Sequence, residues 1–242
     1  MQAHVAPRLL AAGDAALVVE FGEVIDPGLN ARVLALDAKA AGLPGVVETV
    51  PTYRSLLVHY DPTATDFRTL GDALLGLSEG LSDAPAEGRL WRIPVVYGGE
   101  FGIDLEDVAA HHGISTDELI RRHSAPEYRV YMMGFLPGFA YLGGLDPTIA
   151  ISRRESPRLK TPAGTISIGG IQALVASIEA PSGWHLLGRT PVRNFMAARD
   201  PVFILDAGDR VKFAPIPASE WPPLDAAAEA GEIVAEVIGC ES

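Results

Sequence analysis

Arginine side chains concentrated in one part of the chain are the groups best suited to bind an anion. Between Ser152 and Arg199 lie seven basic and two acidic residues, so this segment carries +5 and the rest of the chain, whose overall net charge is −12, carries −17. The basic residues are Arg153, Arg154, Arg158, Lys160, Arg189, Arg193 and Arg199. A planar guanidinium fork suits carboxylate and phosphate groups. The segment therefore favours a site for a nucleotide phosphate, a carboxylate substrate or an acidic partner surface.

The predicted substrate or anion site consists of Arg153, Arg154, Arg158, Arg189 and Thr190. Because barrel strands bring distant segments together, we expect these four arginines to converge on one concave surface, where an anionic ligand or a partner carboxylate offsets their like charges. Arg193 and Arg199 are expected nearer the surface. The alternative is that each arginine pairs with one of the surplus acidic residues elsewhere in the chain.

Glycine-rich and aromatic segments supply the candidate pocket lining. Gly134 to Gly144 combines glycines, which let a backbone approach a ligand closely, with flat aromatic faces; the alternative is a buried loop that packs its own aromatic residues. Trp184 and His185 alternate along an expected strand, so one faces inward and the other outward. His185 could act as an acid or base near neutral pH, with a structural role as the alternative. The predicted lining is Phe135, Pro137, Gly138, Phe139, Tyr141, Pro162, Gly164, Gln172, Trp184 and His185.

Composition excludes several classes of protein and of site. A net charge of −12 repels nucleic-acid phosphates and anionic membranes, so neither is an expected partner. The single cysteine, Cys240, allows no intrachain disulfide and no cysteine-based zinc cluster, and it fits a cytoplasmic protein. Asp14 interrupts the first apolar stretch, and the 16-residue uncharged run Val130 to Leu145 contains a proline and four glycines, so we expect neither a signal peptide nor a membrane span.

Known catalytic and nucleotide-binding motifs are missing from the sequence. GxxxxGKS/T, GxGxxG and HExxH do not occur. No metal site is therefore expected, and the residue pattern names no catalytic group.

The first 80 residues alternate strand-like and helix-like segments. Strands are expected over 15–21, 46–50 and 55–60, where apolar and β-branched residues dominate. One helix is expected from Asp26, an N-cap followed by proline, to a stop near Gly42, and a second helix over 66–77. This βαββα order predicts a ferredoxin-like, split βαβ domain over residues 1–80, followed by a breaker-rich linker over 81–90.

Residues 91–220 are expected to form a mainly-β barrel. Fifteen Gly or Pro residues among the 58 from Gly134 to Pro191 exclude long helices there. Short helices are expected from Asp104 and from Ser115, which has the capping-box partner Glu118. Residues 221–242 are a C-terminal tail, with a helix expected over 224–238. The expected strands are 92–97, 129–135, 165–168, 173–178, 184–187, 202–205 and 211–216.

Several short stretches, each weak alone, resemble one family when taken in order. They are GDAAL from Gly13, VPTYRSL from Val50, PVVYGG from Pro94, Asp104-Leu105, GFLPGFAYL from Gly134, Arg153-Arg154 with Pro157-Arg158, Pro162-Ala163-Gly164, Gly188-Arg189-Thr190-Pro191, and Gly208-Asp209 with Val211 and Phe213. Over residues 10–216 the chain thus resembles the B subunit of the bacterial 5-oxoprolinase complex. That family is also called allophanate hydrolase subunit 1 and KipI-type kinase inhibitor.

The resemblance implies a fold, an activity and partners. The fold is a small α/β domain followed by a cyclophilin-like barrel. The chain would be one part, inactive alone, of an ATP-dependent hydrolase that opens 5-oxoproline to L-glutamate together with an A subunit and a KipA-like C subunit. ATP and Mg²⁺ are then cofactors of the complex rather than of this chain in particular.

Two alternatives stay open at this point. The chain could be a KipI-type module that binds and inhibits a histidine kinase, or half of a carboxyltransferase-like site acting on a urea-type substrate, as in urea carboxylase. Retention of the arginine-rich segment favours an enzyme over a pure binding module. Ala176-Ser177 replaces the tyrosine-proline pair of the family, and Ser152 stands where a proline is expected. Loss of the tyrosine removes one wall of the expected pocket, so the substrate could differ from 5-oxoproline.

Overall fold

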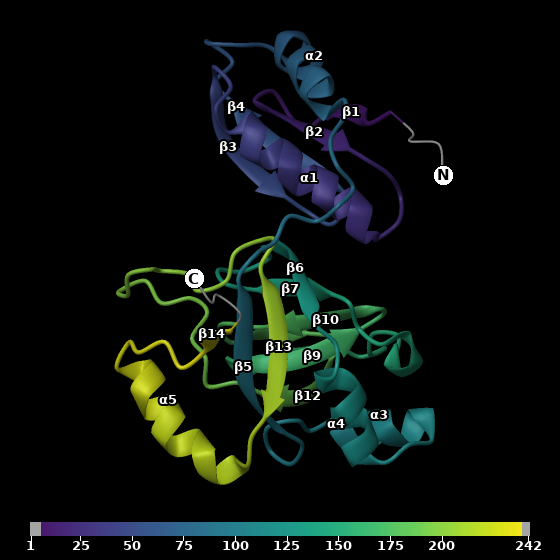
Figure 1. The fold of residues 1–242 in the computed structure, drawn as a ribbon, viewed down its shortest axis with the longest axis vertical. Helices are drawn as coiled ribbons and strands as arrows, with labels where there is room; N and C mark the ends of the chain where they lie inside the picture. The colour runs from purple at the N-terminus through teal and green to yellow at the C-terminus, as the bar shows by residue number, and fades with distance from the viewer. Residues whose placement is uncertain (1–5, 239–242) are drawn as a thin grey trace. The chain divides into compact units, whose positions relative to one another are not determined.

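A computed structural model describes residues 6–238 of the chain (Figure 1). The chain divides between Glu87 and Gly88 into two compact units. This division falls in a stretch, residues 79–89, that forms neither helix nor strand. Cys240 lies outside the described residues. Within residues 6–238, no helix combines the length and the hydropathy needed to cross a membrane.

The first unit contains a four-stranded antiparallel sheet. Its strands lie in the order β1 (Arg8–Ala11), β2 (Ala16–Glu20), β4 (Ser55–Tyr60) and β3 (Val46–Pro51). Strands β2, β3 and β4 lie where the sequence predicts them. Strand β1 was not predicted, because it is short and mostly exposed and so lacks the apolar alternation that marks a half-buried strand.

Both helices of this unit begin at the aspartates that the sequence indicates. Asp26 precedes α1 (Pro27–Ala40), and its side chain accepts a hydrogen bond from Leu29 N at 3.0 Å. Asp66 precedes α2 (Phe67–Ser78) and accepts from the N–H groups of the second and third helical residues, each at 2.9 Å. Such caps satisfy backbone donors that the first turn of a helix leaves free. The helix positions are therefore fixed by local chemistry.

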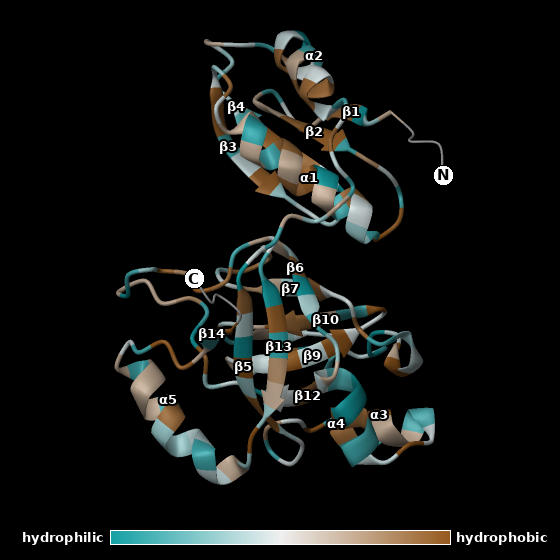
Figure 2. Ribbon diagram, in the orientation of Figure 1, coloured by the Kyte–Doolittle hydropathy of each residue, from teal (hydrophilic) through white to brown (hydrophobic). Residues whose placement is uncertain are grey.

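Apolar side chains of the strands and helices form one core in this unit. Figure 2 colours much of β2 brown, as hydrophobic. Helices α1 and α2 pack against each other, and both contact the sheet. The fully buried members alternate along β2 and β4 and recur at helical spacing along α1 and α2. They are Leu17, Val19, Phe21, Val33, Leu36, Ala40, Leu56, Val58, Tyr60, Leu70 and Leu74.

Seven strands of the second unit form a closed barrel, and Figure 1 shows the α-helices of this unit outside it. Each neighbouring pair is antiparallel except β5 with β13, which run parallel. A pairing between β12 and β5 closes the ring, while β14 (Glu236–Ile238) joins β5 beyond that seam. Around the ring the order is β12 (His185–Arg189), β9 (Thr165–Gly169), β10 (Gln172–Val175), β7 (Ala140–Gly143), β6 (Tyr128–Met133), β13 (Arg210–Pro215) and β5 (Leu90–Tyr97).

Closure of the barrel depends on a glycine. Gly188 of β12 pairs with Tyr97 of β5, and a Cβ atom added to Gly188 would lie 2.5 Å from the carbonyl oxygen of Val96. No side chain fits at that distance without movement of the backbone. Gly188 therefore lets the first and last strands of the ring approach closely.

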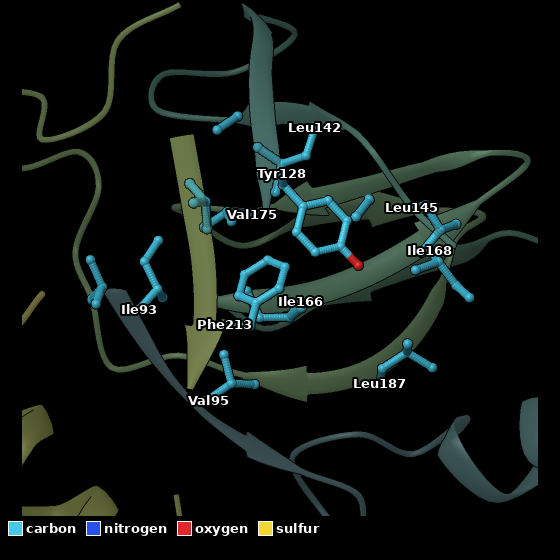
Figure 3. Close-up of a cluster of buried hydrophobic side chains, with 14 of the residues drawn as sticks. Ile93, Val95, Tyr128, Leu142, Leu145, Ile166, Ile168, Val175, Leu187 and Phe213 are labelled. Atoms are coloured by element: carbon cyan, nitrogen blue, oxygen red, sulfur yellow. The ribbon is translucent and has the colours of Figure 1, made fainter. Parts of the chain in front are cut away.

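The barrel interior is filled by side chains from all seven strands (Figure 3). Tyr128 and Phe213 are the largest fully buried residues, and their rings lie 5.1 Å apart. Small barrels have interiors that side chains fill completely. The other residues that Figure 3 labels are Ile93, Val95, Leu142, Leu145, Ile166, Ile168, Val175 and Leu187.

Helices and a small sheet surround the barrel. Helix α3 (Leu105–His112) contacts β12, and α4 (Thr116–Ser124) contacts β13. Ser115 caps α4, accepting from Glu118 N at 3.2 Å, as the capping-box pattern predicts. Strands β8 (Arg158–Thr161) and β11 (Ala180–Ser182) pair in a separate two-stranded sheet.

Two expectations for the C-terminal part are wrong. Residues 202–205 form only an isolated bridge, Phe203 with Phe195, instead of a strand. The expected helix over 224–238 is shorter and earlier, α5 (Trp221–Glu229), and β14 follows it. Strand β14 forms by pairing with β5, a partner about 145 residues earlier in the chain that a short stretch of sequence does not contain.

Candidate functional site

A buried carboxylate, Asp104, organises the arginine-rich segment. Its side chain accepts hydrogen bonds from both terminal nitrogens of Arg158, at 2.8 and 2.6 Å, and from Arg154 Nη1 at 3.1 Å. The backbone N–H of Leu186 in β12 donates a further bond at 2.8 Å. Asp104 precedes α3 but makes no side-chain cap bond there. Its carboxylate instead joins the start of α3 to the arginine segment and to β12.

The protonation of Asp104 is set by two opposing effects. Burial by itself would raise the pKa of Asp104. The hydrogen bonds from Arg158 and from Leu186 N, together with the charges of Arg158 and Arg154, outweigh burial and hold this pKa below its usual value. Asp104 is therefore ionised at neutral pH and neutralises one of its two arginines.

Backbone contacts hold residues 152–158 beside the start of β12. Arg154 N donates to Gly183 O at 2.7 Å, and Arg158 pairs with Ser182 in the β8–β11 ladder. His185 Nε2 lies 2.9 Å from the carbonyl oxygen of Ser152. This contact gives the side chain of His185 a structural partner, in line with the structural alternative stated for it.

Arg153 differs from Arg154 and Arg158 because it stacks on an aromatic ring. Its guanidinium carbon lies 5.3 Å from the centroid of the buried Trp184 ring, within cation–π range. Tyr141 meets the same tryptophan edge-on at 5.9 Å between centroids. Burial raises the pKa of Tyr141, and the charge of Arg153 acts in the opposite direction. Arg153, Trp184 and Tyr141 thus form one group.

The three neighbouring arginines leave an excess of positive charge. Arg154 and Arg158 share the single charge of Asp104, and Arg153 makes no ion pair with any residue between 6 and 238. The group of Arg153, Arg154, Arg158 and Asp104 therefore carries +2. An arrangement of this kind can bind a carboxylate or phosphate.

The glycine-proline loop 134–139 supplies part of the predicted lining. Phe139 is buried beside Trp184 in a small apolar cluster, whereas Phe135 is 66% exposed and has a left-handed backbone, φ 70°. Pro137 is exposed, and its carbonyl oxygen accepts a hydrogen bond from the Ser177 hydroxyl. The structure thus divides the predicted lining into core residues and residues that face solvent.

Arg189 and Thr190 have a different set of contacts. Arg189 Nε donates to Ala163 O at 3.1 Å, and the guanidinium lies 4.9 Å from the Trp221 ring of α5. Burial lowers the pKa of Arg189. Arg189 and His185 occupy opposite ends of β12, about 13 Å apart at the usual rise per strand residue. Convergence of Arg189 with the Asp104 group stays a prediction.

Buried backbone contacts surround the remaining predicted residues. Thr190 has no exposed surface, and its N–H donates to Gly164 O at 2.8 Å. Gln172 is buried on β10, and Pro162 is exposed, with its carbonyl oxygen accepting from the Thr165 hydroxyl at 2.7 Å. These contacts join the turn at 162–165 to the end of β12.

The expectation that Arg199 lies near the surface is wrong. Arg199 is only 8% exposed because the chain folds back at this turn, where Arg199 Nε donates to Pro201 O at 3.0 Å. Arg193 is partly buried and pairs with Asp225 of α5 at 2.6 Å. Sequence reasoning also missed the role of Asp104, which it treated as the start of a helix. The nearest sequence signal is that Asp104 precedes a helix whose first turn already holds Glu106 and Asp107.

Comparison with known proteins assigns the family. Residues 7–205 match the family described as "Carboxyltransferase domain, subdomain C and D". The chain belongs to this family. The 5-oxoprolinase B subunit of Bacillus subtilis is 40% identical over 86% of this chain and 92% of its own length. The protein of the same name from Escherichia coli O157:H7 is 38% identical over 84% of this chain and 93% of its own length.

Solved structures share the fold of this chain. TTHA0988 is 34% identical, with a TM-score of 0.74 over 84% of this chain, and this chain spans 40% of that longer protein. Urea amidolyase of K. lactis matches 95% of this chain with a TM-score of 0.79 at 20% identity, and the match covers 16% of that protein. The second likeness shows that the fold is shared.

Proposed function

We propose that this chain is the B subunit of a 5-oxoprolinase, an ATP-dependent hydrolase that opens 5-oxoproline to L-glutamate. The observation that carries the proposal is the 38–42% identity to three proteins that bear the name of the 5-oxoprolinase B subunit. The chain acts with a homologue of the C subunit of that complex and with its A subunit, and it works in the cytoplasm, where ATP is available. Alone it turns over no substrate, because in this proposal the other subunits complete the catalytic site.

In this proposal the Asp104 group binds the carboxylate of 5-oxoproline. Arg153 is the binding group, since Asp104 already holds Arg154 and Arg158. Trp184 fixes the guanidinium plane, and Tyr141 supports the tryptophan. A planar fork on a rigid aromatic support is pre-organised for a carboxylate.

ATP and Mg²⁺ are cofactors of the complex in this proposal. Among residues 6–238, no group of three or more His, Cys, Asp or Glu side chains could hold a metal ion. No step of this chain is assigned to ATP or Mg²⁺, which act in the complex as a whole.

Two fold assignments accompany the functional proposal. The order β2-α1-β3-β4-α2 fits a ferredoxin-like, split βαβ domain over residues 1–80 in which β1 takes the place of the fourth strand. The seven-stranded ring fits a cyclophilin-like barrel over residues 91–220, with β5 beginning one residue earlier at Leu90, and residues 81–90 are proposed as the linker.

A carboxyltransferase-type activity is the second candidate. A putative urea carboxylase of Emericella nidulans is 23% identical over 74% of this chain. Ala176-Ser177 at the edge of the loop 134–139 removes a tyrosine that the 5-oxoprolinase pattern contains, which favours a substrate other than 5-oxoproline.

Reconstitution tests both candidates. The chain is mixed with the A and C subunits from the same genome, ATP, Mg²⁺ and 5-oxoproline, and glutamate release is measured with each protein omitted in turn. We expect glutamate only from the complete mixture. Turnover by the isolated chain, or ATP consumption by the complete mixture with urea but not with 5-oxoproline, contradicts the first proposal.

A further inference from the structure

A short hairpin on the barrel, residues 194–204, takes no part in the proposed anion site. Phe195 and Phe203 pair across it as an antiparallel bridge, with ring centroids 5.3 Å apart. Met196 N donates to Val202 O at 3.0 Å above this bridge. Residues 197–201 then form the turn. The hairpin is therefore an ordered extension of the barrel.

The turn buries a charged side chain without a counter-charge. Arg199 Nε donates to Pro201 O, but Nη1 and Nη2 are buried and have no hydrogen-bond partner among residues 6–238. Burial lowers the pKa of Arg199. A buried guanidinium without an acceptor destabilises the form of the protein that contains it. Nη1 and Nη2 of Arg199 are thus two donors that an anion could accept from.

The hairpin and the loop 134–139 form one structural element. The fully buried side chain of Asn194 donates to Gly138 O at 2.6 Å and accepts from Leu205 N at 2.8 Å. A Cβ atom on Gly138, whose φ is +75°, would lie 2.6 Å from Phe195 Cβ. Only glycine allows this contact between loop and hairpin.

Large apolar side chains of this element face solvent. Phe135 is 66% exposed, Phe203 41% and Val202 37%. We call these three side chains, with the turn that holds Arg199, the apolar face. The apolar face thus combines exposed aromatic residues with a desolvated arginine, residue types that are enriched at the energetic centre of protein–protein interfaces.

We propose that the apolar face binds the homologue of the C subunit, and that Arg199 receives an Asp or Glu side chain of that partner, flanked by apolar residues. The inference rests on the proposed function, which makes this chain one member of a complex. Charge complementarity selects the acid, because the arginine fork matches a carboxylate. The terminal nitrogens of Arg199 lie below the surface, so binding moves the turn 197–201.

Calorimetric titration with the purified C subunit from the same genome tests the proposal. Phe203→Asp and Arg199→Gln should each weaken binding by about thirtyfold or more, the range of interface hot spots. Ile171→Asp is the matched control, since Ile171 is 55% exposed in the β9–β10 turn and lies outside the apolar face. Phe203→Asp changes an exposed position, so it remains informative if Arg199→Gln fails to fold.

Each outcome decides the proposal. Weakening by Phe203→Asp and Arg199→Gln, with wild-type affinity for Ile171→Asp, supports it. Equal affinities of all four proteins overturn the apolar face as the docking site and leave the proposed function standing. A wild-type chain that does not bind the C subunit overturns both. Dimerisation of the chain alone that Phe203→Asp abolishes assigns the face to a second copy and overturns the proposed partner.

Discussion

Asp104 and Asp209 are two buried carboxylates of the barrel that bind arginine with different results. Asp209 accepts bonds from Arg89 Nε and Nη2 at 3.1 and 2.6 Å and from Trp91 Nε1 at 3.1 Å. Arg89 also pairs with Asp206 at 2.7 Å, so these three charges sum to −1. The Asp104 group, in contrast, carries +2 with Arg153 included.

We interpret the difference as that between a structural cluster and the proposed binding cluster. At Asp209, acids outnumber arginines, and each bond ties the start of β5 to the loop before β13. At Asp104, arginines outnumber acids, and one guanidinium stacks on an aromatic ring instead of pairing. Burial of a carboxylate alone therefore does not reveal function, whereas the local charge balance does.

The largest effect is expected from Asp104→Ala. Removal of the shared carboxylate leaves two partly buried like charges and the buried N–H of Leu186 without an acceptor. We expect the free energy of unfolding, measured with urea, to fall by about 3 kcal/mol. Glu236→Ala, which removes an exposed partner of Arg92, should change it by less than about 0.5 kcal/mol. A loss equal to that of the control would show that Asp104 does not hold this group of arginines and β12 together.

Asp209→Ala should have a smaller effect on stability and none on the anion site. Arg89 is partly exposed and regains water, so the loss is about 2 kcal/mol, the range for bonds to a charged group. Glutamate release by the reconstituted enzyme, assayed well below the melting temperature, should keep its wild-type kcat/KM. A selective loss of kcat/KM would remove the distinction between the two clusters.

Arg153→Gln should have the opposite effects, leaving stability unchanged and lowering activity. Because Arg153 pairs with no acid among residues 6–238, the free energy of unfolding should stay within about 0.5 kcal/mol. Loss of one charged hydrogen bond to substrate should lower kcat/KM of the reconstituted enzyme by about tenfold to a hundredfold. Lys160→Gln is the control, since Lys160 pairs with the exposed Glu179. Equal activities of the two variants would remove Arg153 from the site.

The smallest effect is expected on the free energy of unfolding when the pH falls from 6.5 to 5. Burial lowers the pKa of His123 to about 3. Below pH 6.5 the His123 imidazole is therefore protonated in the unfolded chain and neutral in the folded chain. Stability should therefore fall from pH 6.5 to pH 5 by at most about 1.4 kcal/mol per pH unit. Asp104, whose pKa lies below its usual value of 3.8, keeps its contribution throughout this window and loses it only at lower pH.

Urea unfolding at pH 7, 6 and 5 measures this slope. His123→Gln should lower the slope, because the fully buried imidazole is removed; the remaining slope comes from His112, whose pKa is also lowered by burial. The exposed His111 is the control, and His111→Gln should leave the slope at its wild-type value. A slope unchanged by His123→Gln would assign the acid sensitivity to other groups.

Local chemistry determined much of this protein from the sequence alone. Asp26, Asp66 and Ser115 cap helices through bonds that span two or three residues, so each cap is visible in a short window. Apolar alternation likewise located most barrel strands. The concentration of arginines pointed correctly to a segment with excess positive charge.

Only the tertiary structure decided which of Arg153, Arg154 and Arg158 makes no ion pair within residues 6–238. Asp104 lies 50 and 54 residues from Arg154 and Arg158, and Asp209 lies 120 residues from Arg89. Strand β14 and the buried Arg199 likewise depend on partners or folds that no short window contains. The free energy of a charge depends on which groups surround it in space, and the sequence states composition without stating those neighbours.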